Sequence, residues 1–217
     1  MFTKRIAKEL QQFCKNENNI YLVAENDQLS DLRALLIGPD DTPFEGAFFY
    51  FSINPESYPH CPPKVTFLTP YSDKCRMHPN LYAEGKVCLS ILGTWGKFEW
   101  SPLLTFEKIL LTIQGLLDNH PLSHEPSFEM MQQNDIKSVE YAIQSRWLAL
   151  NSVLFMHKRQ DIPEMFRDVI SSYVQSHKEQ YQQSISKLEP YDNKTIHTIH
   201  GNHKINVMSL RTSFDSL

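Results

Sequence analysis

Cys88 is the residue whose surroundings most favour a chemical role in this chain of 217 residues. It lies in a proline-rich stretch that leaves little room for regular structure, and functional residues concentrate in such irregular segments. It also follows Gly85 and Lys86, and a nearby cation favours the reactive thiolate form of a cysteine. Inert burial is the alternative, because it is the common fate of a free cysteine.

Two other chemistries would use the neighbours of Cys88. Cys75, His78 and Cys88 are three potential zinc ligands, but the spacing provides no fourth ligand, so we expect no metal site. A Cys/His hydrolase would need a histidine beside the cysteine, and the 9 histidines of the chain make such a neighbour common by chance. We interpret His78 as a hydrogen-bonded structural histidine.

Periodic segments flank the irregular stretch and predict the elements that position Cys88. Apolar residues recur at helical spacing in 2–15 and 105–118, whereas 20–24, 32–37, 47–53 and 64–69 resemble strands. A strong turn signal at 38–41 separates the second strand from the third. Strands joined by such short turns predict a four-stranded antiparallel meander, and with the helices an α+β fold.

Helical periodicity returns near the C-terminus. It is visible in 139–157 and in 164–188, whereas 192–217 carries little periodic signal. We therefore predict a core over residues 1–157 and a helical extension over 158–217 that packs on this core.

The composition of the chain limits the kinds of partner and the cellular environment that we expect for it. The chain is 41% hydrophobic and 21% charged, as soluble globular proteins are, and its net charge of −4 implies no broad basic surface for nucleic acid. No apolar run is long enough to span a membrane, and the first residues do not form a secretory signal. The 4 cysteines are sparse and irregularly spaced, which predicts reduced thiols in the cytoplasm or nucleus.

Four motifs occur in an order that resembles the ubiquitin-conjugating enzyme family. His78-Pro79-Asn80, with Cys88 in the run Gly-Lys-Val-Cys-Leu-Ser-Ile-Leu, resembles its catalytic segment. Residues 38–46 resemble its hairpin between strands two and three, 58–65 the segment entering strand four, and Trp100-Ser101-Pro102 the loop before the second helix. The resemblance covers roughly residues 2–155.

The resemblance implies both the fold and the chemistry. Cys88 would accept ubiquitin or a ubiquitin-like protein from an activating enzyme as a thioester and pass it to a substrate lysine. Asn80 would hold the oxyanion or order the loop that does so, while His78, Pro79 and Trp100 belong to the structural motif. No cofactor is implied, because the activating enzyme consumes the ATP. Two alternatives remain open: a non-catalytic relative, which would lack the cysteine, and a thiol hydrolase.

Two departures from the family pattern concern the base that deprotonates the lysine. Ser90 stands where the family commonly has aspartate, and Ser123-His124-Glu125 replaces an acidic loop. His124 and Glu125 are therefore both candidates to desolvate and deprotonate the incoming amine. The alternative is that both are ordinary polar residues of a loop tip.

The resemblance also implies two partner surfaces. The activating enzyme would bind a basic stripe on the first helix, and ligases of the RING class would bind two loops. The stripe consists of Lys4, Arg5 and Lys8. One of the two loops carries Pro59 and His60, and the other carries Ser101 and Pro102. His60 replaces a frequent bulky aromatic residue, which argues against binding the common RING ligases. An ordinary solvated helix face is the alternative for the stripe.

Two further runs resemble one large-domain subgroup of the family. These are 88–95, Cys-Leu-Ser-Ile-Leu-Gly-Thr-Trp, and 125–129, Glu-Pro-Ser-Phe-Glu. The subgroup includes the enzyme loaded with both ubiquitin and a tandem ubiquitin-like modifier, and the conjugating domain of the giant inhibitor-of-apoptosis protein. Trp100 lies further from Cys88 than in ordinary members, so we expect an additional loop beside the active site.

Overall fold

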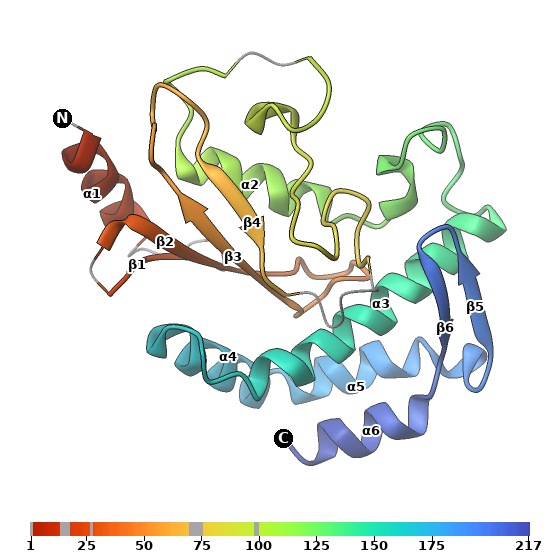
Figure 1. Ribbon diagram of the computed structural model, residues 1–217. Helices are drawn as coiled ribbons and strands as arrows, with labels where there is room; N and C mark the ends of the chain where they lie inside the picture. Colours follow the sequence, from red (N-terminus) through yellow and green to blue (C-terminus); the bar gives the residue numbers. More distant parts are fainter. Residues whose placement is uncertain (1, 14–17, 27, 70–75, 98–99) are drawn as a thin grey trace.

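The computed structural model describes the chain except for residues 1, 14–17, 27, 70–75 and 98–99. It has the predicted α+β architecture, in which one antiparallel sheet lies between α2 and the helices that follow it (Figure 1). The helices are α1 (Phe2–Gln12), α2 (Phe106–Leu116), α3 (Ile136–His157), α4 (Glu164–Ser176), α5 (Lys178–Ser186) and α6 (Val207–Asp215). The strands are β1 (Ile20–Glu25), β2 (Gln28–Ile37), β3 (Phe48–Asn54), β4 (Lys64–Phe67), β5 (Thr195–Thr198) and β6 (Gly201–Lys204).

The main sheet is the predicted meander, with the strand order β1-β2-β3-β4 and antiparallel pairing throughout. One face of α2 packs on it, because Phe106, Ile109, Leu110 and Ile113 follow the helical repeat and all are buried. The helix begins at Thr105, whose side chain accepts a hydrogen bond from the Lys108 amide at 3.2 Å. The predicted first helix, four strands and central helix are therefore confirmed, with ends that shift by a few residues; Cys14 and Lys15 of the first predicted helix lie outside the described residues.

The C-terminal helices share their core with the sheet. Strand β3 is buried on both faces: Phe49 stacks on Phe67 at a centroid distance of 6.1 Å, whereas Tyr50 meets Phe166 of α4 edge-on, also at 6.1 Å. A single cluster of buried apolar side chains runs from α1 to α6. The division of the chain at residue 157 stays a prediction.

The prediction of one helix over 164–188 was wrong. The helix is interrupted at His177, which has a φ of −118° and lies between the end of α4 and the start of α5. The Tyr173 ring stacks on His177 at 3.7 Å, and beyond the break the Tyr181 hydroxyl donates to the Gly46 carbonyl at 2.8 Å. Gly46 has a φ of +69° and leaves room for the Tyr181 ring, so docking of the second helix on the sheet overrides the continuous periodicity.

The extension is also not wholly helical, contrary to the prediction. Strands β5 and β6 form a two-stranded antiparallel hairpin that lies along α3 (Figure 1). Each strand has only 4 residues, too few for an alternation to stand out in the sequence. Within the described part of the chain, no helix has both the length and the apolar character that a membrane crossing requires.

Candidate active site

Cys88 lies at the end of a short antiparallel ladder within the loop between β4 and α2. Its amide donates to the Asn80 carbonyl at 2.9 Å, and the Tyr82 amide donates to the Lys86 carbonyl at 3.0 Å. Gly85 closes the turn with a φ of +94°. Because side chains alternate between the faces of such a ladder, Asn80, Tyr82, Lys86 and Cys88 share one face.

The Asn80 side chain ties this face together. Its Nδ2 donates to the Cys88 carbonyl at 2.8 Å, while its Oδ1 is buried and has no hydrogen-bond partner among the described residues. An amide nitrogen carries two N–H donors, so one donor remains beside the cysteine. Asn80 can therefore order the loop and still offer a hydrogen bond to a developing oxyanion.

His78 supports the ladder from below as a neutral histidine. The Asn80 amide donates to its Nδ1 at 3.1 Å, so the proton is on Nε2, which donates to the Leu116 carbonyl at 2.9 Å. Complete burial lowers the pKa of His78 to about 3. Both ring nitrogens are thus occupied and neither is available to a metal ion; Cys75, the other ligand considered, lies outside the described residues.

The thiol of Cys88 is covered, although the expected chemistry needs an accessible sulfur. The residue is only 1% exposed. Tyr82 lies diagonally across the ladder from Cys88 on the same face, and burial, followed by the neighbouring Cys88, raises the pKa of this half-buried tyrosine. Across the ladder, Lys86 Nζ lies 5.3 Å from the centre of the Tyr82 ring.

Arg76 connects this face to the rest of the molecule. Its guanidinium lies 3.7 Å from the centre of the Tyr82 ring and donates a hydrogen bond to the Pro79 carbonyl. It also lies 2.9 Å from His200 Nε2 and 3.4 Å from Glu125 Oε2. Three segments remote in sequence therefore meet at one arginine.

His200, in the turn of the β5–β6 hairpin, is neutral in this arrangement. An arginine only donates, so His200 Nε2 accepts, and Nδ1–H donates to the Tyr141 hydroxyl at 2.6 Å. Burial, followed by the charge of Arg76, lowers the pKa of His200 to about 4. Glu125 Oε2 lies 3.3 Å from the unprotonated Nε2, so this contact brings two acceptors together and is no ion pair.

The two candidate bases, His124 and Glu125, face different partners. His124 Nε2 lies 2.8 Å from Asp118 Oδ2. Burial raises the pKa of Asp118, but hydrogen bonds from His124 and from the His120 amide outweigh it and leave the pKa lowered. Glu125 faces Arg76 instead, and among the described residues neither candidate hydrogen-bonds to Cys88.

The two predicted ligase loops lie side by side. Trp100 Nε1 donates to the Pro59 carbonyl at 2.7 Å, and Arg5 donates to the Pro102 carbonyl at 2.6 Å. His60 and Pro102 are exposed, as is the neighbouring Leu103 at 87%, whereas Ser101 is half-buried. Trp100 therefore joins the two loops of this surface.

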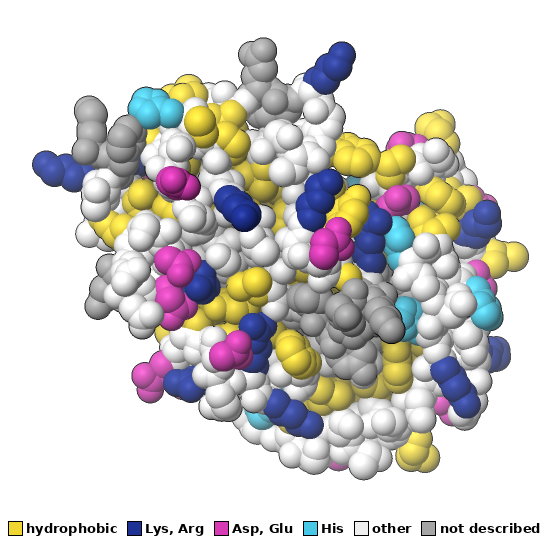
Figure 2. Space-filling view, in the orientation of Figure 1, with side chains coloured by type: hydrophobic (Ala, Val, Ile, Leu, Met, Phe, Trp, Pro, Cys, Tyr) yellow, Lys and Arg dark blue, Asp and Glu magenta, His cyan; other side chains and the backbone are white. Residues whose placement is uncertain are grey.

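The three residues of the predicted basic stripe on α1 differ in their exposure and contacts. Lys4 and Lys8 are exposed, whereas the half-buried Arg5 donates to Glu9, Tyr58 and two backbone carbonyls. Charges of both signs are interspersed on the face shown in Figure 2.

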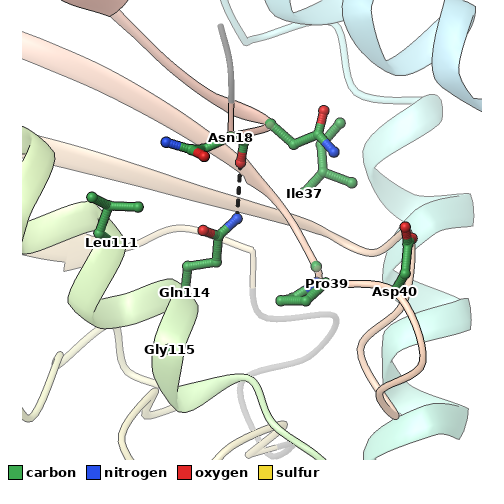
Figure 3. A pocket seen from close by; sticks show the side chains of 9 residues that line it. Asn18, Ile37, Pro39, Asp40, Leu111, Gln114 and Gly115 are labelled. Carbon is green, nitrogen blue, oxygen red and sulfur yellow. Dashed lines mark hydrogen bonds between the residues drawn. The ribbon is translucent and has the colours of Figure 1, made fainter.

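A separate pocket of about 470 Å³ opens between the β2–β3 turn and α2 (Figure 3). Gln114 on its wall donates to the Asn18 carbonyl at 2.9 Å. The pocket contains none of the predicted site residues, and its lining consists of Asn18, Asn19, Ile37, Gly38, Pro39, Asp40, Leu111, Gln114 and Gly115.

Both the sequence and the structure of this chain resemble those of known proteins. The sequence model of the family described as "Ubiquitin-conjugating enzyme" matches residues 5–149, which include the whole ladder. The chain belongs to this family. The E2 domain of a Toxoplasma gondii ubiquitin conjugating enzyme has a similar structure, with a TM-score of 0.53 and 30% identity over 67% of this chain and 94% of that one.

Two longer members of the ubiquitin-conjugating enzyme family illustrate the sequence similarity. The probable ubiquitin-conjugating enzyme protein 17 of Caenorhabditis elegans is 38% identical over 79% of this chain and 25% of its own length. Human ubiquitin-conjugating enzyme E2 Z is 34% identical over 76% of this chain and 48% of its own. The chain thus matches a quarter to a half of these curated relatives.

The sequence analysis missed Arg76, Tyr82, Tyr141 and His200. Tyr82 had a signal, because its even spacing from Asn80 and Cys88 places all three on one face once a ladder is assumed. The other three come together only in the fold, and His200 lies in the segment that had no periodic signal.

Proposed function

We propose that this chain accepts ubiquitin or a ubiquitin-like protein from an activating enzyme as a thioester on Cys88 and transfers it to a substrate lysine. The observation that carries the proposal is the shared ladder face, where the Asn80 amide lies beside the cysteine in a chain of this family. In this proposal the Cys88 thiolate attacks the carbonyl carbon of the incoming thioester, and the second N–H of Asn80 stabilises the resulting oxyanion.

The partner surfaces extend this proposal. The activating enzyme binds the α1 face through Lys4 and Lys8, with Arg5 holding the helix in place. The joined loops around Pro59 and Pro102 receive a ligase, and the exposed Leu103 beside them offers an apolar contact. Either His124 or Glu125 would approach the amine only after leaving its present partner.

We also propose membership of the large-domain subgroup. The support is the stretch between Cys88 and Trp100, where the Thr94 hydroxyl donates to the Val87 carbonyl at 2.7 Å and accepts from the Leu89 amide at 2.8 Å. These bonds tie the additional loop to the active-site strand, and Trp95 stands 44% exposed beside it. Such a loop is suited to distinguish modifiers or acceptors.

A loading assay tests the main proposal. The chain is incubated with activating enzyme, ATP and a panel of modifiers, and adducts are resolved on a non-reducing gel. Cys88→Ser is expected to give a slow, reductant-resistant oxyester or no adduct, because a serine hydroxyl is the poorer nucleophile. Cys14→Ser, Cys61→Ser and Cys75→Ser should load normally. A normal reducible adduct on Cys88→Ser would reject Cys88 as the acceptor.

A further inference from the structure

The C-terminal hairpin reaches the active site through contacts that the transfer chemistry described above does not use. His200 lies in the β5–β6 turn, and the Arg76 guanidinium lies 2.9 Å from its Nε2. Tyr141 of α3 fixes the other side of the imidazole at 2.6 Å. The ring is therefore held at both nitrogens and presents one acceptor to Arg76.

Arg76, held by His200, in turn restricts the position of Tyr82 in the ladder. Its guanidinium lies over the Tyr82 ring at 3.7 Å, which is close for a cation–π contact and restricts rotation of the ring. Glu125 lies on the same arginine at 3.4 Å from a second segment. Three side chains thus determine where the Tyr82 hydroxyl points.

Tyr82 is placed to act on the nucleophile. It lies diagonally across the ladder from Cys88 on the shared face, and side chains at such positions are within reach of one another. Lys86, directly opposite Tyr82, confirms the face, because its Nζ lies 5.3 Å from the Tyr82 ring centre. Since burial raises the pKa of Tyr82, its phenol stays protonated and can donate to the sulfur.

We propose that the β5–β6 hairpin completes the active site: His200 and Glu125 hold Arg76 against the Tyr82 ring and so direct the Tyr82 hydroxyl at the Cys88 sulfur. Tyr82 is then a catalytic residue, and Arg76, Glu125 and His200 are positioning residues. The proposal rests on the proposed role of Cys88 as the acceptor. It makes the β5–β6 hairpin a part of the active site.

The role of the hydroxyl follows from the bonds that change. In loading, the Cys88 thiolate forms a bond to the thioester carbonyl carbon, and the bond to the activating enzyme's sulfur breaks with its electron pair. In discharge, the amine nitrogen bonds to that carbon, the electron pair returns to Cys88, and the amine proton passes to the base that deprotonates the lysine. The Tyr82 O–H keeps its proton throughout and stabilises the charged sulfur by a hydrogen bond.

Alkylation of the protein alone tests this without any modifier or activating enzyme. Iodoacetamide is added at pH 7.5, and modification of each cysteine is followed by peptide mass spectrometry. The exposed free Cys61 is the internal reference in every variant. Tyr82→Phe keeps the ring and removes the hydroxyl, so Cys88 should be alkylated about tenfold more slowly, as expected for one hydrogen bond to a charged group.

A double-mutant cycle separates positioning from general structural support. His200→Ala should slow Cys88 alkylation about threefold in the wild-type background and not at all in Tyr82→Phe, because it acts only through the hydroxyl. His200→Gln, which keeps an acceptor for Arg76, should restore the rate. His197→Ala, an exposed histidine on the same hairpin, is the matched control and should change nothing.

The same order of variants is expected for single-turnover loading, with melting temperatures as a check on folding. Unchanged or faster Cys88 alkylation in Tyr82→Phe would overturn the proposal, as would equal slowing by His200→Ala in both backgrounds. If Cys88 of the wild type resists alkylation while Cys61 reacts, the double-mutant cycle is measured by single-turnover loading instead. Absence of the cycle in that measurement as well would overturn the proposal. Failure to load any modifier, with the alkylation pattern intact, would instead contradict the proposed function.

Discussion

Two clusters of arginine, tyrosine and glutamate lie in this molecule and differ in how well their polar atoms are satisfied. Near α1, Glu9 accepts from the Tyr58 hydroxyl at 2.5 Å, from Arg5 at 2.8 Å and from the Phe106 amide at 2.9 Å. The Arg5 guanidinium lies 5.0 Å from the Tyr58 ring centre. Every carboxylate oxygen of this first cluster has a donor, and the cluster fastens α1 to α2.

The second cluster contains Arg76, Tyr82 and Glu125. Here Arg76 Nε and Glu125 Oε2 are both buried without a hydrogen-bond partner among the described residues. Buried polar atoms that lack a partner destabilise a fold, so they persist where another requirement maintains them. The difference teaches that residue types alone do not mark a site: the saturated cluster is structural, and the incompletely satisfied one faces the nucleophile.

The largest expected effect lies beside the second cluster. Asn80→Ala should slow discharge to lysine by about a hundredfold while loading changes little, because attack by an amine is the harder step and depends more on oxyanion stabilisation. Single-turnover rates of both steps measure this, together with a melting curve. If Asn80 only orders the loop through the Cys88 carbonyl, both steps and the melting temperature should fall together. A discharge rate within about twofold of wild type would remove Asn80 from the chemistry.

The first cluster should respond in stability instead. Glu9→Gln leaves Arg5 and Tyr58 with a poorer acceptor in a buried position, so urea denaturation should show a loss of about 2–3 kcal/mol in the free energy of unfolding. The matched change Glu125→Gln should cost less than about 1 kcal/mol, since the carboxylate it replaces is incompletely satisfied. Equal losses for the two variants would abolish the contrast between the clusters.

A smaller effect is expected at the exposed residues beside the first cluster. Because Arg5 is engaged with Glu9, the proposed docking of the activating enzyme would depend on Lys4 and Lys8. Reversing both charges should slow loading about three- to tenfold and leave discharge from preloaded protein unchanged, because rim charges act mainly on association. The slowing should shrink in high salt. Reversal of the exposed Lys158, which directly follows α3, and of the exposed Lys178, the first residue of α5, is the control, and equal slowing there would mean that the stripe is not a docking site.

The sequence was sufficient for the parts that follow a repeat or a motif. The meander and α2 were predictable because alternation and helical spacing are local, and Cys88 and Asn80 stand in a motif with fixed spacing. The break at His177 was not, since the periodicity continues through it and only docking of Tyr181 on Gly46 reveals the need for a bend. His200 was invisible for a related reason: its role arises from contacts with Arg76, 124 residues earlier.

The smallest expected effect concerns stability in acid and again separates the two clusters, because Arg76 of the second cluster contacts a histidine, His200. Burial holds the pKa of His200 at about 4, below its ordinary value of 6.5. The unfolded chain therefore takes up a proton that the folded chain does not, so stability is complete above pH 6.5 and falls as the pH drops toward 4. The completely buried His78, whose pKa is about 3, contributes in the same direction and over a wider range.

His200→Gln should remove part of this acid dependence while keeping an acceptor for Arg76. The melting temperature of wild type is expected to fall between pH 7 and pH 4.5, and the fall should be a few degrees smaller in the variant, because His200 is only partly buried and solvent weakens its contribution. The exposed His197→Gln should melt like wild type at both pH values. Identical falls in wild type and His200→Gln would mean that His200 titrates as a free histidine, and the neutral imidazole that accepts from Arg76 would then be wrong.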